Sequence, residues 1–441
     1  MISLTELYSL YKKSTGLTTD SRQVKDGMIF FALRGENFDG NDYAEAALKA
    51  GARYAVVDRV AMDGLSWRGR TCIMVENVLD MLQQLAAYHR RQYDIPVLGI
   101  TGTNGKTTTK ELISAVLGKK FRVVATQGNF NNHIGVPLTL LRIDDKTELA
   151  VVEMGASAPG EIAGLTQLVR PTCGLVTTVG KAHLQGFGSF EGVKKTKGEL
   201  YDYLRQTGGM VFYDADNPDI CEMVARRPGL CTRRYGVKEQ GVRIAPATAE
   251  APFLQLEYGS EDKPVKIATK LVGDYNAVNV MAALTIGEFF EVPARAACLA
   301  VESYKPSNSR SQLVKTERNT LVVDAYNANP SSMRAALDNF AATDFPNKVL
   351  MLGDMLELGE DSAKEHLAIL KKAKNVAPLV LVVGPTFSKV CDKIAHEQDR
   401  FVAFPDVEAL KEYLAANPVE GSTILVKGSN GIHMQQLVDV L

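Results

Sequence analysis

Cysteine and tryptophan are scarce in this sequence of 441 residues, which holds six cysteines and one tryptophan. The cysteines are scattered and form no close pairs with the spacing of metal ligands. Their pattern excludes a metal site built from neighbouring cysteines, and it is typical of buried thiols in a reducing compartment. We therefore expect a cytoplasmic protein. The six are Cys72, Cys173, Cys221, Cys231, Cys298 and Cys391.

An excess of charge of either sign is also lacking, because 50 lysine and arginine residues face 51 aspartate and glutamate residues. No net field attracts nucleic acid or an anionic membrane, so local groups must hold any anionic substrate. Apolar runs stay short of the roughly 18 residues that suggest a membrane span. The first 13 residues mix polar and apolar types, unlike a secretion signal. We expect neither a nucleic-acid nor a membrane partner, and the charge balance is compatible with a monomer.

Length and composition favour several globular domains. The chain is 46% hydrophobic and 23% charged, and its length suits about three domains. Apolar strand-like runs alternate with helical stretches, which predicts an α/β fold with mostly parallel sheets. We expect an N-terminal α/β domain over 1–94, a central P-loop parallel-sheet domain over 95–304 and a C-terminal doubly wound, Rossmann-like domain over 305–441. A turn-rich segment near 242–272 predicts a local β-meander.

The stretch Val97–Lys110 predicts a phosphate-binding loop between a strand and a helix. Gly102 and Gly105 permit unusual backbone angles and leave room for a triphosphate beside the backbone N–H groups. The helix that begins near Lys106 directs its positive end at the same place. Lys106 can reach the terminal phosphates and Thr107 can ligate magnesium. The residues expected to bind ATP here are Gly102, Thr103, Asn104, Gly105, Lys106, Thr107 and Thr108.

The match to the usual phosphate-loop pattern is good but not strict. The pattern places a glycine at position 100, where this chain has Ile100, and Gly99 lies one residue early. The alternative is an ordinary glycine turn before a helix. A strand of the buried type before Gly-Thr-Asn-Gly-Lys-Thr favours the nucleotide loop.

Two further candidates follow predicted strands, where open α/β sheets place their ligands. Glu153 ends the strand Leu149–Val152, so its carboxylate should emerge at the same sheet edge as the phosphate loop. Mg²⁺ prefers a few carboxylates together with phosphate oxygens and water, which suits Glu153. The second candidate is His183. The alternative for Glu153 is a solvated or capping acid, and the alternative for His183 is an ordinary polar loop residue.

A lysine run over Lys194, Lys195 and Lys197 has two interpretations. Such a run usually forms a solvated helix face. A lysine ammonium has only donors and cannot ligate a cation. A neutral lysine that captures CO₂ becomes an anionic carbamate, and burial or nearby positive charge would supply the neutral form.

With these residues in place, the chain resembles the Mur ligase family of ATP-dependent amide-bond ligases that build the peptidoglycan stem peptide. The resemblance covers essentially the whole chain. Tyr-Asn-Ala-Asn-Pro, which follows a predicted strand, is the most specific string. Besides the phosphate loop, the matching segments are Asp20–Arg22, Leu33–Gly40, Gly128–Pro137, Lys195–Glu199, Leu271–Asn279, Val323–Pro330 and Leu352–Gly359.

The resemblance implies roles for individual residues. The implied catalytic set is Lys106, Glu153, His183 and a carbamylated Lys197, with Thr107, Glu153, His183 and Lys197 as Mg²⁺ ligands. The implied ATP contacts beyond the loop are Asn276, Asn279, Arg310, Asp324, Tyr326, Asn327 and Asn329. The implied residues for the UDP-linked substrate are Ser21, Arg22, Asn131 and Asn132.

The implied reaction is the ADP-forming addition of D-alanyl-D-alanine to UDP-N-acetylmuramoyl-tripeptide through an acyl phosphate. Two alternatives stay open: another ligase of the Mur or folylpolyglutamate type, and a P-loop ATPase with no amide-forming step. The third residue of the tripeptide, lysine or diaminopimelate, stays open as well.

Some positions depart from the family or have an ordinary structural alternative. Asn430 stands where the family commonly has arginine, and Gln435 where an acid is often found, so an arginine contact is in doubt there. Asp354 and His366 could orient the incoming dipeptide, or could serve as helix-surface or capping residues. Asn329 could simply start a helix ahead of Pro330.

Overall fold

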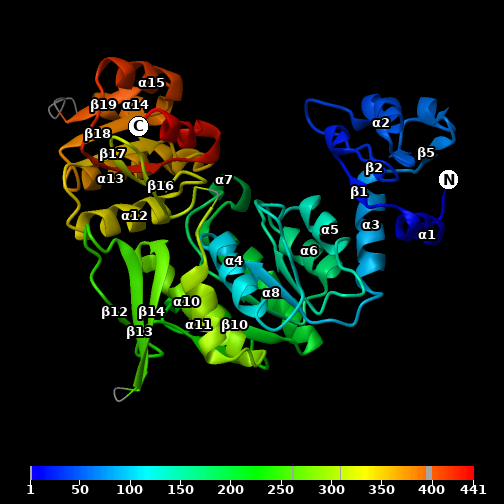
Figure 1. Cartoon of the computed structure of the whole chain (residues 1–441), viewed down its shortest axis with the longest axis horizontal. Helices are drawn as coiled ribbons and strands as arrows, with labels where there is room; N and C mark the ends of the chain where they lie inside the picture. Colours follow the sequence, from blue (N-terminus) through cyan, green and yellow to red (C-terminus); the bar gives the residue numbers. More distant parts are fainter. Residues whose placement is uncertain (1, 261–262, 308, 394–399) are drawn as a thin grey trace. The chain divides into compact units, whose positions relative to one another are not determined.

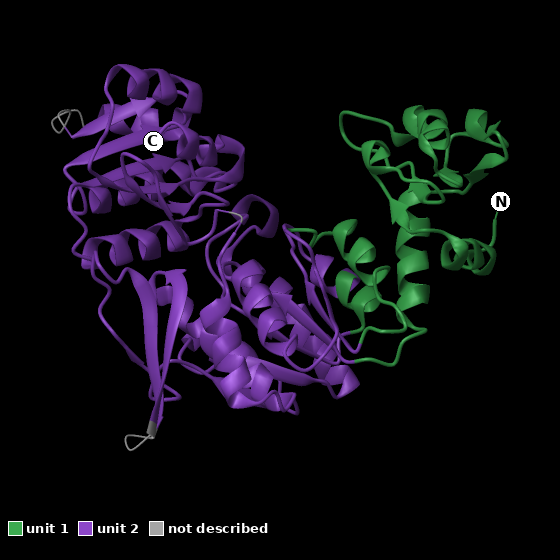
Figure 2. Cartoon of the chain, in the orientation of Figure 1, with its two compact units in different colours: residues 1–95, 129–147, 165–170 green, residues 96–128, 148–164, 171–441 purple. Residues whose placement is uncertain are grey.

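The computed structural model describes residues 2–260, 263–307, 309–393 and 400–441. The chain forms two compact units (Figures 1 and 2). The first contains residues 1–95, 129–147 and 165–170, and the second contains the rest of the chain. The domain limits predicted from the sequence, 1–94, 95–304 and 305–441, stay predictions.

The first unit is built on a five-stranded sheet of order β1-β2-β3-β5-β4, in which only β4 runs antiparallel to its neighbour. Its first helix begins at a capping box formed by Ser3 and Glu6. The strands are β1 (Leu17–Thr18), β2 (Ile29–Phe31), β3 (Tyr54–Val57), β4 (Ser66–Trp67) and β5 (Arg70–Met74). The helices are α1 (Leu4–Lys13), α2 (Ala44–Ala50), α3 (Val78–Arg90) and α5 (Gly135–Leu140).

The second unit begins with a six-stranded parallel sheet of order β11-β10-β9-β6-β8-β7. Its strands are β6 (Val97–Thr101), β7 (Val123–Ala125), β8 (Leu149–Glu153), β9 (Cys173–Val176), β10 (Met210–Asp214) and β11 (Cys231–Tyr235). The helices of this region are α4 (Lys106–Leu117), α7 (Leu184–Phe187), α8 (Phe190–Thr207), α9 (Pro218–Ala225), α10 (Ala277–Phe289) and α11 (Ala294–Ser303). Helix α6 (Glu161–Val169) begins in this unit, and its residues from 165 onward belong to the first.

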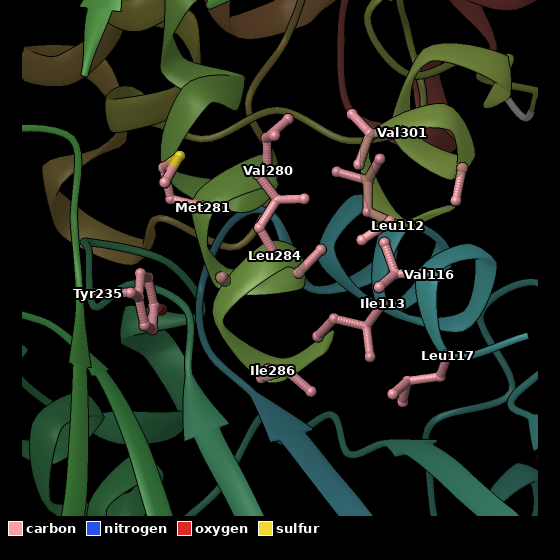
Figure 3. Close-up of a cluster of buried hydrophobic side chains, with 14 of the residues drawn as sticks. Leu112, Ile113, Val116, Leu117, Tyr235, Val280, Met281, Leu284, Ile286 and Val301 are labelled. Atoms are coloured by element: carbon pink, nitrogen blue, oxygen red, sulfur yellow. The ribbon is translucent and has the colours of Figure 1, made fainter. Parts of the chain in front are cut away.

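The core of this region joins the sheet to helices α4, α10 and α11. Leu112 and Val116 of α4 are fully buried among Val280 of α10 and Val301 of α11 (Figure 3). Their spacing along α4 places them one above the other on the same helix face. Ile100 is part of the same core. Position 100 lies within β6, where the Ile100 side chain is buried in that core. The glycine turn begins only two residues later, so position 100 does not need a glycine.

The predicted β-meander near 242–272 is confirmed. It is a three-stranded antiparallel sheet of β12 (Arg243–Ile244), β13 (Phe253–Ser260) and β14 (Lys263–Val272).

A second six-stranded sheet follows, of order β15-β16-β20-β17-β18-β19, with β15 antiparallel and the other strands parallel. This order is doubly wound, as the sequence predicts, so the α/β fold is confirmed. The strands are β15 (Gln312–Lys315), β16 (Thr320–Asp324), β17 (Lys348–Gly353), β18 (Leu379–Val383), β19 (Phe401–Phe404) and β20 (Thr423–Lys427). The helices are α12 (Pro330–Ala342), α13 (Ser362–Ala373), α14 (Pro385–Cys391) and α15 (Val407–Ala416).

Across the described residues, each helix is too short or too polar to cross a membrane.

Leu112→Ala should lower the free energy of unfolding by about 2–5 kcal/mol, because it removes a fully buried side chain and leaves a cavity. Leu299→Ala is the matched control, since Leu299 lies on α11 with 51% of its surface exposed, and its cost should stay within about 0.5 kcal/mol. Urea unfolding followed by circular dichroism measures both. Equal losses would contradict the assignment of Leu112 to the core.

Candidate active site

The loop between β6 and α4 depends on its two glycines. Gly102 has a φ of +144°, and a Cβ there would lie 2.1 Å from Thr177 Oγ1. Gly105 has a φ of +79°, and a Cβ there would lie 2.9 Å from Asn279 Oδ1. Side chains therefore meet both a conformational and a steric barrier at these positions.

The segment that follows β9 fixes the loop from the side. Thr103 N donates to Thr178 O over 2.8 Å, and Asn104 N donates to Thr178 Oγ1 over 2.9 Å. Thr177 Oγ1 donates to Asn104 O over 2.6 Å. Sequence reasoning missed both threonines, although hydroxyl residues directly after a parallel strand were the available signal. They hold the loop backbone in the shape of a phosphate cradle.

Lys106 folds back over its own loop. Its Nζ donates to Gly102 O over 2.8 Å and to Thr103 O over 3.1 Å. Burial lowers the Lys106 pKa, the Glu153 carboxylate opposes that shift, and Arg310 adds to it. Arg310 and Glu153 thus lie within electrostatic range of the lysine.

Thr107 and Glu153 come together as predicted. Thr107 Oγ1 donates to Glu153 Oε2 over 2.9 Å, and Glu153 is only 1% exposed at the end of β8. Thr126 Oγ1 accepts a hydrogen bond from the Glu153 backbone N–H over 3.0 Å. The burial and the hydroxyl contact argue against a solvated acid. A hydroxyl beside a carboxylate is a donor set of the kind that Mg²⁺ accepts, so these two residues fit the ion.

Lys197 lies in the interior on α8, only 3% exposed, and its Nζ donates to Ala156 O over 3.2 Å. Burial, reinforced by the positive charge of Lys106, lowers the pKa of Lys197 to about 7. The solvated-face alternative is therefore wrong for Lys197, and also for the buried Lys194, whose Nζ pairs with Asp219 over 2.6 Å.

His183 precedes α7 with a φ of +50° and pairs through Nδ1 with the Glu357 carboxylate. Burial lowers the His183 pKa, with Glu357 opposing the shift and with Lys106 and Lys197 adding to it. His183 therefore lies near both lysines. Among the residues with described positions, no three His, Cys, Asp or Glu side chains group closely enough to hold a metal ion by themselves.

Asn329 joins the C-terminal region to the phosphate loop. Its Nδ2 donates to Asn104 Oδ1 over 2.7 Å, and Asn104 Nδ2 donates to Ser331 Oγ over 2.9 Å. Asn329 also caps α12 ahead of Pro330, so the helix-start alternative and the contact with the loop both hold.

Arg310 and Tyr326 stack, with the guanidinium carbon 3.6 Å from the ring centroid. Burial raises the Tyr326 pKa, with Arg310 opposing and Glu153 adding to the shift, which places the pair near the phosphate loop. The Nε of Arg310 is buried and has no hydrogen-bond partner among the residues that the structure describes.

Asp324 ends β16 and pairs with Lys427 Nζ over 2.5 Å. The same Nζ donates to Asn327 O over 3.2 Å. Lys427 is a positioning residue that sequence reasoning missed, although Lys-Gly-Ser after a strand could have signalled it. It holds two of the predicted ATP contacts in place.

Asn276 and Asn279 connect α10 to the helix of the phosphate loop. Asn279 Nδ2 donates to Asn276 Oδ1 over 3.0 Å, and Thr109 Oγ1 donates to Asn279 Oδ1 over 3.0 Å. Their contact with ATP stays a prediction, and in the structure Asn279 lies directly beside Gly105 of the loop.

The predicted substrate residues lie in the first unit. Ser21 and Arg22 form a short turn, and the exposed Arg22 guanidinium holds the Asp20 carboxylate, whose pKa it lowers through hydrogen bonds. Asn132 caps the start of a turn by accepting from Gly135 N over 2.9 Å, and Asn131 is half-buried beside it. Their role in substrate binding stays a prediction.

Asp354 and His366 serve the fold. His366 is fully buried, accepts from Met355 N over 3.0 Å through Nε2, and lies 2.7 Å through Nδ1 from Ser362 O. Burial by itself raises the Asp354 pKa, but hydrogen bonds from the Thr386 and Phe387 N–H groups oppose it, and the pKa is lowered. Asn430 is exposed at the surface.

Three domain patterns of one family match the chain. They are described as "Mur ligase family, catalytic domain" over residues 13–90, "Mur ligase middle domain" over 100–287 and "Mur ligase, glutamate ligase domain" over 309–430.

Similar proteins cover nearly the whole chain. UDP-N-acetylmuramoyl-tripeptide–D-alanyl-D-alanine ligase of Bacillus subtilis is 34% identical, over 96% of this chain and 92% of the relative. The enzyme of the same name from Escherichia coli is 33% identical, over 96% and 93%. A crystal structure of MurF from Acinetobacter baumannii superposes with a TM-score of 0.83 at 25% identity, over 99% and 98%. MurF ligase from Thermotoga maritima in complex with ADP gives 0.81 at 26%, over 98% and 97%.

Lys427→Met should lower the free energy of unfolding by about 3 kcal/mol, because it leaves the Asp324 carboxylate without its buried partner. Adding Asp324→Asn should recover part of the loss, with a coupling energy of about 1 kcal/mol or more in the double-mutant cycle. Chemical denaturation measures all three variants.

Lys411→Met is the matched control, because it breaks the partly exposed contacts of Lys411 with Glu408 and Gln436 and should cost at most about 1 kcal/mol. A Lys427 variant as stable as this control would contradict the role given to the buried pair.

Proposed function

Because this chain belongs to the Mur ligase family, we propose that it is the ATP-dependent ligase that joins D-alanyl-D-alanine to UDP-N-acetylmuramoyl-tripeptide in peptidoglycan synthesis. The observation that carries the proposal is the near-complete coverage by relatives of that name at 34% and 33% identity. A ligase of another specificity and an ATPase without an amide-forming step are not favoured, since neither accounts for those relatives.

ATP binding rests on the loop geometry and on the structural likeness to a MurF ligase in complex with ADP. The backbone N–H groups around Gly102 and Gly105 and the start of α4 suit the triphosphate. Lys106 would exchange its two loop carbonyls for phosphate oxygens. We assign the remaining ATP contacts to Thr103, Asn104, Thr107, Thr108, Asn276, Asn279, Arg310, Asp324, Tyr326, Asn327 and Asn329.

The reaction must bring two anions together, the tripeptide carboxylate and the ATP triphosphate, before it forms the amide. A carboxylate oxygen of the tripeptide attacks the γ-phosphorus, the bond to the ADP oxygen breaks, and an acyl phosphate and ADP result. The amine of the dipeptide then attacks the acyl carbon, and inorganic phosphate leaves. Lys106 and Arg310 offset the negative charge in the first step.

Thr107, Glu153, His183 and a carbamylated Lys197 would hold Mg²⁺, which supplies further positive charge at the triphosphate when it is bound. The side chains of Lys106, Glu153, His183 and Lys197 form the proposed catalytic set. Ser21, Arg22, Asn131 and Asn132 are proposed to bind the UDP-linked substrate.

We place the protein in the cytoplasm as a monomer. All six cysteines are free, which suits a reducing compartment. Sedimentation of the purified chain tests the oligomeric state.

Phosphate release from ATP should depend on both UDP-N-acetylmuramoyl-tripeptide and D-alanyl-D-alanine, since the second step discharges the acyl phosphate. Mass spectrometry should identify the pentapeptide product. The control is Lys106→Ala, which should lose activity by about 100-fold or more because it removes charge stabilisation at the reacting phosphate. Turnover that ignores the dipeptide would refute the proposal and leave an ATPase.

Lys197 should carry a carbamate under bicarbonate. Its burial and its pKa near 7 keep a large neutral fraction at neutral pH, and only the neutral amine captures CO₂. The carbamate signal from ¹³C-bicarbonate should therefore grow as pH rises through about 7, and Lys197→Ala should abolish both signal and activity.

Lys195→Ala is the matched control, because Lys195 is exposed on the same helix and its loss should leave signal and activity unchanged. Full activity of Lys197→Ala without bicarbonate would refute the modification.

A further inference from the structure

Two residues with left-handed backbones meet beside the phosphate loop. His183 has a φ of +50° and Glu357 a φ of +63°, and neither is a glycine. Such angles cost energy in residues with side chains and persist where surrounding contacts enforce them, commonly at functional sites. The Glu357 carboxylate pairs with His183 Nδ1, while 59% of the Glu357 side chain stays exposed. The carboxylate thus faces the site and remains open to a ligand.

The loop that carries Glu357 is fixed by buried polar groups. His366 accepts from Met355 N over 3.0 Å, and Ser429 Oγ accepts from Leu356 N over 3.0 Å. Ser429 N donates to Asp354 O over 3.1 Å. These contacts hold the backbone on the amino side of Glu357 and present its carboxylate in a defined direction.

Two cations, Lys181 and Arg334, form a cluster with Glu365, and Lys181 lies two residues before His183 in the chain. Glu365, only 5% exposed, accepts from Lys181 Nζ over 3.2 Å and from Arg334 Nη2 over 2.9 Å. One carboxylate cannot neutralise two cations, so this cluster keeps a net positive charge. The side chains of Lys181 and Arg334 are 44% and 41% exposed, which leaves their remaining donors open to an anion.

The two charged groups match a dipeptide zwitterion in sign. Glu357 contacts His183, and Lys181 belongs to the cationic cluster, so the segment 181–183 lies beside both groups. Two other acids near the loop are already engaged, Glu153 by Thr107 and Asp324 by Lys427.

We propose that Glu357 binds the ammonium group of the incoming dipeptide and that Lys181 and Arg334 bind its terminal carboxylate. This inference rests on the proposed function and deepens it by naming the acceptor site. Glu365 acts as a positioning residue that holds the two cations together through its two carboxylate oxygens. The site would select a free dipeptide over longer or capped acceptors.

Steady-state kinetics with D-alanyl-D-alanine and with its C-terminal amide test the proposal. Glu357→Gln should raise the KM for the dipeptide by about 10- to 100-fold, the range expected for a lost charged hydrogen bond. Wild type should prefer the dipeptide over the amide, and Arg334→Gln should reduce that preference by about tenfold or more. Glu360→Gln is the matched control, because Glu360 is exposed three residues further on and should leave KM unchanged.

The half-reaction that does not involve the acceptor distinguishes a loss of dipeptide binding from a loss of ATP chemistry or of domain packing. Acyl phosphate formed from ATP and UDP-N-acetylmuramoyl-tripeptide alone, trapped with hydroxylamine, should form at the wild-type rate in both variants. An unchanged KM, or an equal loss of acyl phosphate formation, would overturn the acceptor site. Wild-type turnover without dependence on the dipeptide would instead refute the proposed function itself.

Discussion

The register of three parallel strands is the constraint on which the site depends. β6 pairs with β8 so that Ile100 lies opposite Glu153, and with β9 so that Thr101 lies opposite Val176. The phosphate loop, the Glu153 carboxylate and the Thr177–Thr178 segment therefore leave the sheet at one edge. A shift of one residue in a strand would turn every side chain of that strand to the opposite face of the sheet and separate these groups.

Positive charge dominates this edge, and its distribution matches the proposed chemistry. Three cations, Lys106, Arg310 and Lys197, come from different segments of the chain. The charge of Arg310 lowers the pKa of Lys106, and the charge of Lys106 lowers the pKa of Lys197. Crowded cations destabilise one another in the absence of an anion, so the arrangement favours a bound triphosphate. The same crowding, together with burial, lowers the pKa of Lys197 and favours the neutral amine that a carbamate requires.

The C-terminal sheet completes the site through a small number of polar contacts. Asn329 contacts Asn104, Glu365 contacts Lys181, and Glu357 contacts His183. These side chains lie in loops that follow strands or at the starts of helices, with Glu365 in the first turn of α13. Polar contacts of this kind are partly exposed and individually weak, which suits a boundary that must admit and release substrates.

The fold class, the phosphate loop and the candidate residues could all be predicted from the amino-acid sequence. The glycines before Lys106-Thr107 and the acids at strand ends are recognised from their spacing along the chain. The apolar runs of the buried strands predict a parallel sheet. Tertiary structure alone decided which candidates meet. Lys197 is buried while its neighbour Lys195 is exposed, Asp354 and His366 support a loop, and His183 pairs with Glu357, 174 positions away. Sequence patterns report local periodicity, whereas burial and pairing depend on groups brought together from distant parts of the chain.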